Sequence, residues 1–207
     1  MNVTGRQEWS TTMPANNNSF FYPSASLGFI FTDLPGLNDI PLLPFGKLRT
    51  SYAVTANDAG TYLTRSYWYQ AGFGDGWTNG IAFPFNDYSG FTFSNVMGNE
   101  KLLPEKQKTF EAGIDLRFKE NRLNLDFAYF HNTNENLLMS VPVPSSQGYT
   151  HEYRNAATME TSGLELNLNI TAIKASDFIW NINLNFSNPN TIVKSLSENA
   201  EHISLNT

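Results

Sequence analysis

Apolar and polar residues alternate along much of the chain with a repeat of two residues. Such alternation is typical of a β-strand whose two faces meet different environments. It predicts strands over residues 20–31, 47–55, 109–118, 122–131, 162–171 and 178–186. Helical periodicity is weak throughout. The pattern therefore indicates an all-β fold in which successive strands run antiparallel in an up-and-down meander.

The predicted strands are joined by connections of very different length. Residues 57–108 and 133–161 form long connections, whereas Lys119, Glu120 and Asn121 form a tight turn and residues 171–178 a short one. In a meander, alternate connections lie at the same end of the sheet. Transmembrane β-barrels combine long outer loops with short periplasmic turns, and their strands have about 9–11 residues. The lengths favour a transmembrane β-barrel, to which this chain contributes about six strands.

The two faces of these strands carry different side chains. One face is apolar and is expected to meet lipid (Phe110, Ile114, Leu116, Leu123, Leu125, Phe127). The opposite face is charged and is expected to line a watery lumen (Glu111, Asp115, Arg117, Asp126, Glu165). A soluble β-sandwich with its apolar stripe packed inward is the alternative. Periodicity alone does not choose between them, but strand length and loop asymmetry favour the membrane barrel.

Composition narrows the choice of partners. Hydrophobic residues make up 41% of the 207 residues and charged residues only 15%, against about 25% charged in a usual soluble domain. The net charge of −6 argues against nucleic acid, which binds basic surfaces, and against a polybasic membrane tether. The N-terminus has no signal-peptide pattern, so we expect either an intracellular chain or an interior piece of a longer one.

Motifs for catalysis are missing from the sequence. The three histidines lack the paired spacing of a metal site, and neither a nucleophile-elbow nor a phosphate-loop motif occurs, so we expect no enzyme, metal or cofactor. The connection over residues 57–108 is instead rich in aromatic residues. Trp68, Tyr69, Trp77 and Tyr88 are candidate ligand-binding residues, because aromatic faces can hold a sugar or peptide. Alternatively, these rings pack the loop or form an interfacial girdle.

Two motifs and five longer segments of the chain carry a family resemblance. The most specific motifs are Pro-Glu-Lys at 104–106 and the Asn-Ala…Gly-Leu-Glu-Leu run over residues 155–166. The segments are FFYPSASLGFIFTDL (20–34), KLRTSYAVTANDAGTY (47–62), LLPEKQKTFEAGIDLRFKENRLNLDFAYF (102–130), SSQGYTHEYRNAATMETSGLELNLN (145–169) and DFIWNINLNFSNPNTIVKSL (177–196). Through them, most of the chain resembles the SusC/RagA-type TonB-dependent outer-membrane transporters of the Bacteroidetes.

The resemblance implies a barrel of about 22 strands with an N-terminal plug. Neither a plug nor a TonB-contacting segment is recognisable, and the chain ends HISLNT with no terminal strand. Residues 1–207 are therefore expected to be one barrel segment, with open edges at residues 20–31 and 178–186. Such open edges would invite pairing with further strands.

The resemblance also implies a function in the outer membrane of a Gram-negative cell. It implies import of an oligosaccharide or peptide, driven by TonB and assisted by a SusD-like surface lipoprotein, with contact to outer-membrane lipid and no bond-making chemistry. Two alternatives stay open: a soluble all-β carbohydrate-binding module, and a structural barrel without transport. Neither the pattern nor the resemblance identifies the ligand.

Overall fold

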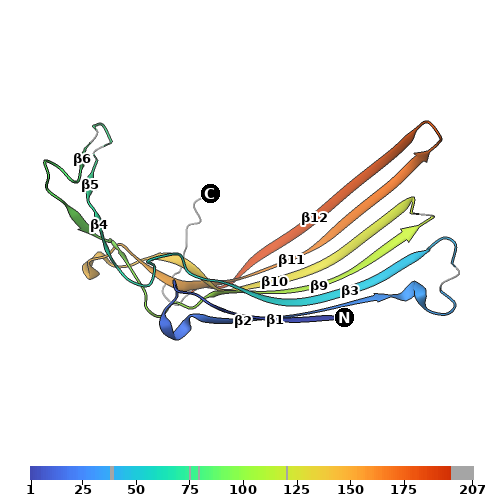
Figure 1. Ribbon diagram of the computed structural model, residues 1–207, viewed down its shortest axis with the longest axis horizontal. Helices are drawn as coiled ribbons and strands as arrows, with labels where there is room; N and C mark the ends of the chain where they lie inside the picture. Colours follow the sequence, from blue (N-terminus) through green and yellow to red (C-terminus); the bar gives the residue numbers. More distant parts are fainter. Residues whose placement is uncertain (38–39, 75, 79, 120, 197–207) are drawn as a thin grey trace.

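The computed structural model describes residues 1–37, 40–74, 76–78, 80–119 and 121–196. Their main element is one curved antiparallel sheet in which each strand pairs with its neighbours along this path (Figure 1). The path is β1 (Asn2–Trp9), β2 (Ser19–Ile30), β3 (Phe45–Asn57), β9 (Glu105–Phe118), β10 (Leu123–Pro142), β11 (His151–Lys174) and β12 (Ile179–Leu196). The sheet does not close. The all-β meander is therefore confirmed, as a partial barrel.

The remaining elements are short. Five small strands lie between β3 and β9: β4 (Trp68–Gln70), β5 (Gly72–Phe73), β6 (Ile81–Ala82), β7 (Phe91–Phe93) and β8 (Val96–Met97). Three 3₁₀ turns interrupt other connections: η1 (Ala15–Asn17), η2 (Phe31–Asp33) and η3 (Ser145–Gln147). Among the described residues, no helix has the length and apolar character needed to cross a membrane.

The structure corrects two expectations about strand extent. β1 was missed, because only Val3 and Trp9 give its outward face an apolar character. Since β1 pairs with Ser19–Ser26 of β2, the predicted open edge at residues 20–31 is wrong for residues 20–26. Among the described residues, β12 is the other edge strand of the sheet and pairs only with β11, so the open edge expected there is confirmed. Expectations for residues 197–207, including His202 and the missing terminal strand, lie outside the described residues.

The predicted long connection over residues 133–161 is also wrong. β10 continues to Pro142 and β11 begins at His151, so the connection is limited to residues 143–150. The pairing shifts register around Asn134 and Leu137, and Asn136 between them has a positive φ of 60°. A bulge of this kind interrupts the two-residue alternation, which explains why the sequence pattern fades there. The long connection that holds is 58–104, at the left end of Figure 1.

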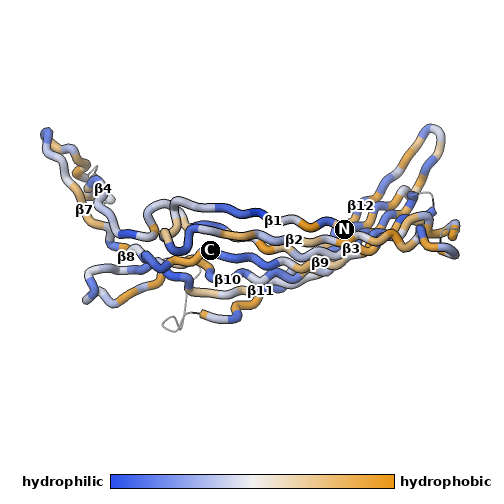
Figure 2. The backbone as a smooth tube through the Cα atoms, turned by 60° about the horizontal axis from the view of Figure 1, so that its bottom comes forward, coloured by the Kyte–Doolittle hydropathy of each residue, from blue (hydrophilic) through white to orange (hydrophobic). Residues whose placement is uncertain are grey.

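The register places apolar side chains on one face across five strands. Ile114 lies opposite Leu48 and Phe127, and Phe127 lies opposite Leu166. None of these large side chains is fully buried: Ile114 and Leu166 are half-buried, whereas Leu164 is 42% exposed and Leu184 is 54% exposed. Figure 2 shows the alternation of apolar and polar positions along the long strands. A sandwich would bury this face, so the geometry favours a sheet built for a non-aqueous surrounding.

A small core lies at the end of the sheet that carries the long connection. Met13, Phe20, Ala59 and Leu102 form one buried cluster, and the side chain of Leu102 is completely buried. These residues come from the β1–β2 connection, from β2 and from the two ends of the long connection. The cluster therefore anchors the long connection where it leaves and rejoins the sheet.

Candidate functional site

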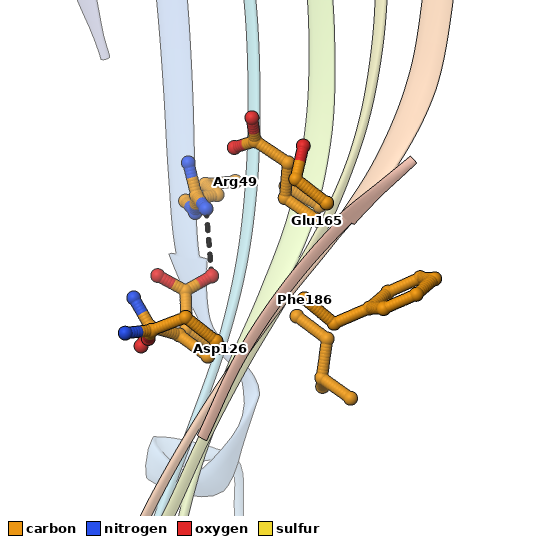
Figure 3. Close-up of a pocket in the computed structure, with 9 residues that line it drawn as sticks. Arg49, Asp126, Glu165 and Phe186 are labelled. Carbon is orange, nitrogen blue, oxygen red and sulfur yellow. Dashed lines mark hydrogen bonds and ion pairs between the residues drawn. The ribbon is translucent and has the colours of Figure 1, made fainter. Parts of the chain in front are cut away.

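Arg49 is the centre of an ionic network on the charged face of the sheet. From β3, its guanidinium contacts Glu111 and Asp115 on β9 and Asp126 on β10. The Nη2–Oδ1 distance to Asp126 is 2.7 Å, drawn in Figure 3, and the Nε–Oδ1 distance to Asp115 is 3.4 Å. One cation thus ties three neighbouring strands together.

Gly113 provides the space for this network. Arg49 lies directly opposite Gly113 in the β3–β9 pairing, and Glu111 and Asp115 flank Gly113 on the same face. A Cβ atom at position 113 would lie 2.9 Å from the Arg49 Nε atom, which is closer than atoms in folded proteins pack. The absence of a side chain at Gly113 therefore lets the guanidinium lie flat over β9.

A groove of about 290 Å³ begins at this network and extends across β11 to β12. Besides Arg49 and Asp126, its polar lining comes from Glu165, Asn167, Asn185 and Ser187. Within the described part of the chain, Glu165 has no ion pair, and in Figure 3 it lies on the same side as Arg49 while Phe186 points away. The groove thus offers carboxylates and amides that can accept or donate hydrogen bonds to a polar solute.

The five residues predicted for the lumen share this charged face. Asp126 lies opposite Asp115, and Arg117 lies opposite Asn124. Glu165 lies opposite Ala128, which is the next residue after Asp126 on the same face of β10. The guanidinium of Arg117 stacks over the ring of Phe45 at 4.6 Å. That the face lines a lumen stays a prediction.

Sequence reasoning missed Arg49. The alternation over residues 47–55 contained the necessary signal, since Arg49 follows Leu48 and must point to the opposite face. The apolar members of that strand predicted its existence, whereas the polar residues between them match no motif. The partners of Arg49 could not be found in this way, because they lie 62 and 77 residues further along the chain.

The four aromatic residues predicted to bind ligand do not form one cluster. Trp68 packs against Phe93 at 5.0 Å between ring centres, whereas Tyr69 lies 6.1 Å from Tyr67. Trp77 lies between β5 and β6 and is 95% exposed, and Tyr88 takes part in an isolated bridge with Phe85. Ligand binding by these four residues stays a prediction.

The sheet holds the long connection at several points. Val96 and Met97 pair in parallel with the first two residues of β11. The amide of Asn155 donates to the carbonyl of Leu103 at 2.7 Å, and its oxygen accepts from the Leu103 N–H at 2.8 Å. These bonds fix the base of the connection, so its aromatic residues project from a rigid support.

Asp58 holds the β1–β2 connection against the start of the long connection. Its carboxylate accepts hydrogen bonds from the hydroxyl groups of Ser10 at 2.5 Å and Thr12 at 3.0 Å. These two hydrogen bonds, that of Ser10 first, lower the pKa of Asp58 because they stabilise its charged form.

An open antiparallel meander with one exposed apolar face and one charged face is the construction of a transmembrane β-barrel wall. Residues 1–198 match the family model described as TonB dependent receptor-like, beta-barrel. The chain therefore belongs to the family of TonB-dependent receptor β-barrels, and its place is the outer membrane. This membership confirms the resemblance found in the sequence and argues against a soluble carbohydrate-binding module.

Two curated relatives align with almost the whole chain. TonB-dependent receptor P3 of Formosa agariphila is 30% identical over 195 residues, which cover 92% of this chain and 18% of that protein. TonB-dependent receptor SusC of Bacteroides thetaiotaomicron is 27% identical over 201 residues, covering 92% of this chain and 19% of SusC. The chain thus spans less than a fifth of the length of these relatives.

Solved structures show the same fold. The RagAB peptide importer in its closed-closed state aligns with a TM-score of 0.79 at 24% identity, over 94% of this chain and 20% of that chain. The siderophore receptor PirA of Pseudomonas aeruginosa aligns with a TM-score of 0.52 at 18% identity, over 86% of this chain and 30% of that chain. The relatives are receptors and transporters.

Proposed function

We propose that this chain forms part of the wall of a TonB-dependent nutrient importer. The family match over residues 1–198 carries this proposal, and the sheet supports it. One face suits lipid, and the Arg49 network and its groove make the opposite face suitable for a hydrated lumen. The name of the RagAB peptide importer supports a peptide as the solute, and the resemblance to SusC-type transporters implies an oligosaccharide as the other candidate.

The proposed mechanism is binding and passage without bond-making. Glu165 and Asp126 offer acceptors to the hydroxyl groups of a sugar or the N–H groups of a peptide, and Asn167 and Asn185 offer both donors and acceptors. Such contacts are weak enough individually for a solute to leave. TonB would supply the energy from the periplasm, and a SusD-like lipoprotein would deliver the solute at the outer surface.

The aromatic connection is proposed as part of the outer mouth. Trp68, Tyr69, Trp77 and Tyr88 expose 66%, 46%, 95% and 77% of their surface, respectively. Exposed rings on a supported connection can stack on sugar rings or on peptide side chains. Because the four rings are spread along the connection, they would meet a long solute at several points rather than one.

Deletion of the encoding gene from its own cell tests this function. We measure the uptake of fluorescently labelled oligosaccharides and of fluorescently labelled peptides. We expect the deletion strain to lose uptake of one of these two classes and to regain it when the wild-type gene is restored. Uptake should also stop when TonB is deleted. A structural barrel without transport, the remaining alternative, predicts unchanged uptake of every class together with a weakened outer membrane. That result would refute the proposal.

A further inference from the structure

A second groove lies on the apolar side of the sheet, near the end with the long connection. It has a volume of about 340 Å³. Phe21, Val54 and Ala56 supply an apolar floor, and Asn16, Asn136 and Lys106 supply polar groups. The groove is therefore amphipathic, with a single cation among the residues that line it.

The register assigns this groove to the face that is proposed to meet lipid. Lys106 lies opposite Ala56, and the same unbroken pairing of β3 with β9 sets Leu48 opposite Ile114. Residues that lie opposite one another point to the same face, and the face repeats every two residues. Lys106 and Ile114 thus share one face, and the groove is continuous with the apolar surface.

The groove lies where that apolar surface ends. Along β9, the outward side chains from Phe118 back to Phe110 are apolar, and the next two are Lys108 and Lys106. Lys108 is neutralised by Glu135 at 2.5 Å. Lys106 is exposed and has no ion pair within the described residues. The boundary between hydrocarbon and water therefore carries one uncompensated positive charge above an apolar floor.

We propose that this groove binds a phosphate-bearing lipid of the outward-facing leaflet. The Lys106 ammonium pairs with the phosphate, Asn16 adds polar contacts, and an acyl chain lies along Phe21 and Val54 toward the apolar surface. Lysine suits this position, because its flexible stem lies along apolar surface while its charge reaches the headgroup level. The inference rests on the proposed membrane orientation, in which the long connection faces outward.

The test uses the full-length receptor in detergent, titrated with a monophosphorylated glycolipid and with the same glycolipid after removal of its phosphate. Native mass spectrometry counts bound lipid. We expect the wild-type protein to bind the phosphorylated form about fivefold more tightly, the effect of one basic charge near an anionic headgroup. Lys106→Gln should abolish this preference. Lys101→Gln, which neutralises a lysine of the long connection that does not line the groove, should retain it.

Several outcomes would overturn the proposal. Equal affinity of the wild-type protein for both glycolipids would do so, as would an unchanged preference in Lys106→Gln. Lys106→Arg keeps the charge and must keep the preference, so its loss there would also exclude a charge-based site. If inorganic phosphate alone bound as tightly as the phosphorylated glycolipid, the apolar floor would have no role and the lipid would be the wrong occupant. This titration does not depend on solute uptake, so it and the import proposal can fail separately.

Discussion

Replacing Arg49 by Met removes the cation that joins three strands of the wall. The side chains of Arg49, Glu111, Asp115 and Asp126 are 31%, 34%, 28% and 47% exposed. Water therefore screens each contact, and each contributes about 0.5–1 kcal/mol. The substitution removes three contacts and leaves three carboxylates facing one another. We expect the free energy of unfolding to fall by about 2 kcal/mol.

Urea unfolding of the full-length protein in lipid vesicles measures this loss, with tryptophan fluorescence as the signal. Arg6→Met is the matched control, because among the described residues Arg6 forms an ion pair only with Glu8, and its side chain is 72% exposed. We expect this control to change stability by no more than a few tenths of a kcal/mol. If Arg49→Met is no more destabilising than Arg6→Met, the network does not hold the wall and the reasoning fails.

Three further predictions concern other parts of the sheet. Gly113→Val should displace the Arg49 side chain, and in urea unfolding its cost should fall in the Arg49→Met background without vanishing, because the added Cβ also lies 3.0 Å from the Phe127 carbonyl oxygen; full additivity would exclude the steric explanation. Leu168→Lys, on the apolar face, should lower stability in vesicles by about 2–4 kcal/mol, whereas Asn167→Lys, one residue away on the charged face, should cost far less; equal costs would contradict the assigned faces. The pKa of Asp58 is lowered, so its carboxylate stabilises the fold above the unfolded pKa, and this contribution is lost as the pH falls through the lowered folded pKa. The melting temperature of Asp58→Asn should therefore lack this acid-dependent decrease. If the melting temperatures of the variant and the wild type changed with pH in the same way, this role of Asp58 would be refuted.

Strand existence could be predicted wherever alternation is regular. The strands over residues 109–118 and 122–131 illustrate this, because their apolar and polar residues alternate with a repeat of two and the alternation predicts the face on which each side chain lies. Prediction failed where the repeat is broken or diluted. The bulge beside Asn136 shifts the register of β10. Although β10 continues to Pro142, its sequence after the bulge loses the alternation and therefore predicts a loop. In β1, polar residues occupy both faces, so the strand becomes visible only through its pairing with β2.

The candidate site divides in the same way. Alternation in the sequence is enough to place Glu111 and Asp115 on one polar face of their strand and Asp126 on the polar face of the next, since it sets the direction of each side chain within a strand. The contact of all three with Arg49 emerges only in the folded sheet, because strand pairing brings together residues far apart in the chain. The space at Gly113 likewise matters only because Arg49 lies opposite it on the neighbouring strand. Alternation is a local property of one strand, whereas register and contact depend on which strands lie side by side.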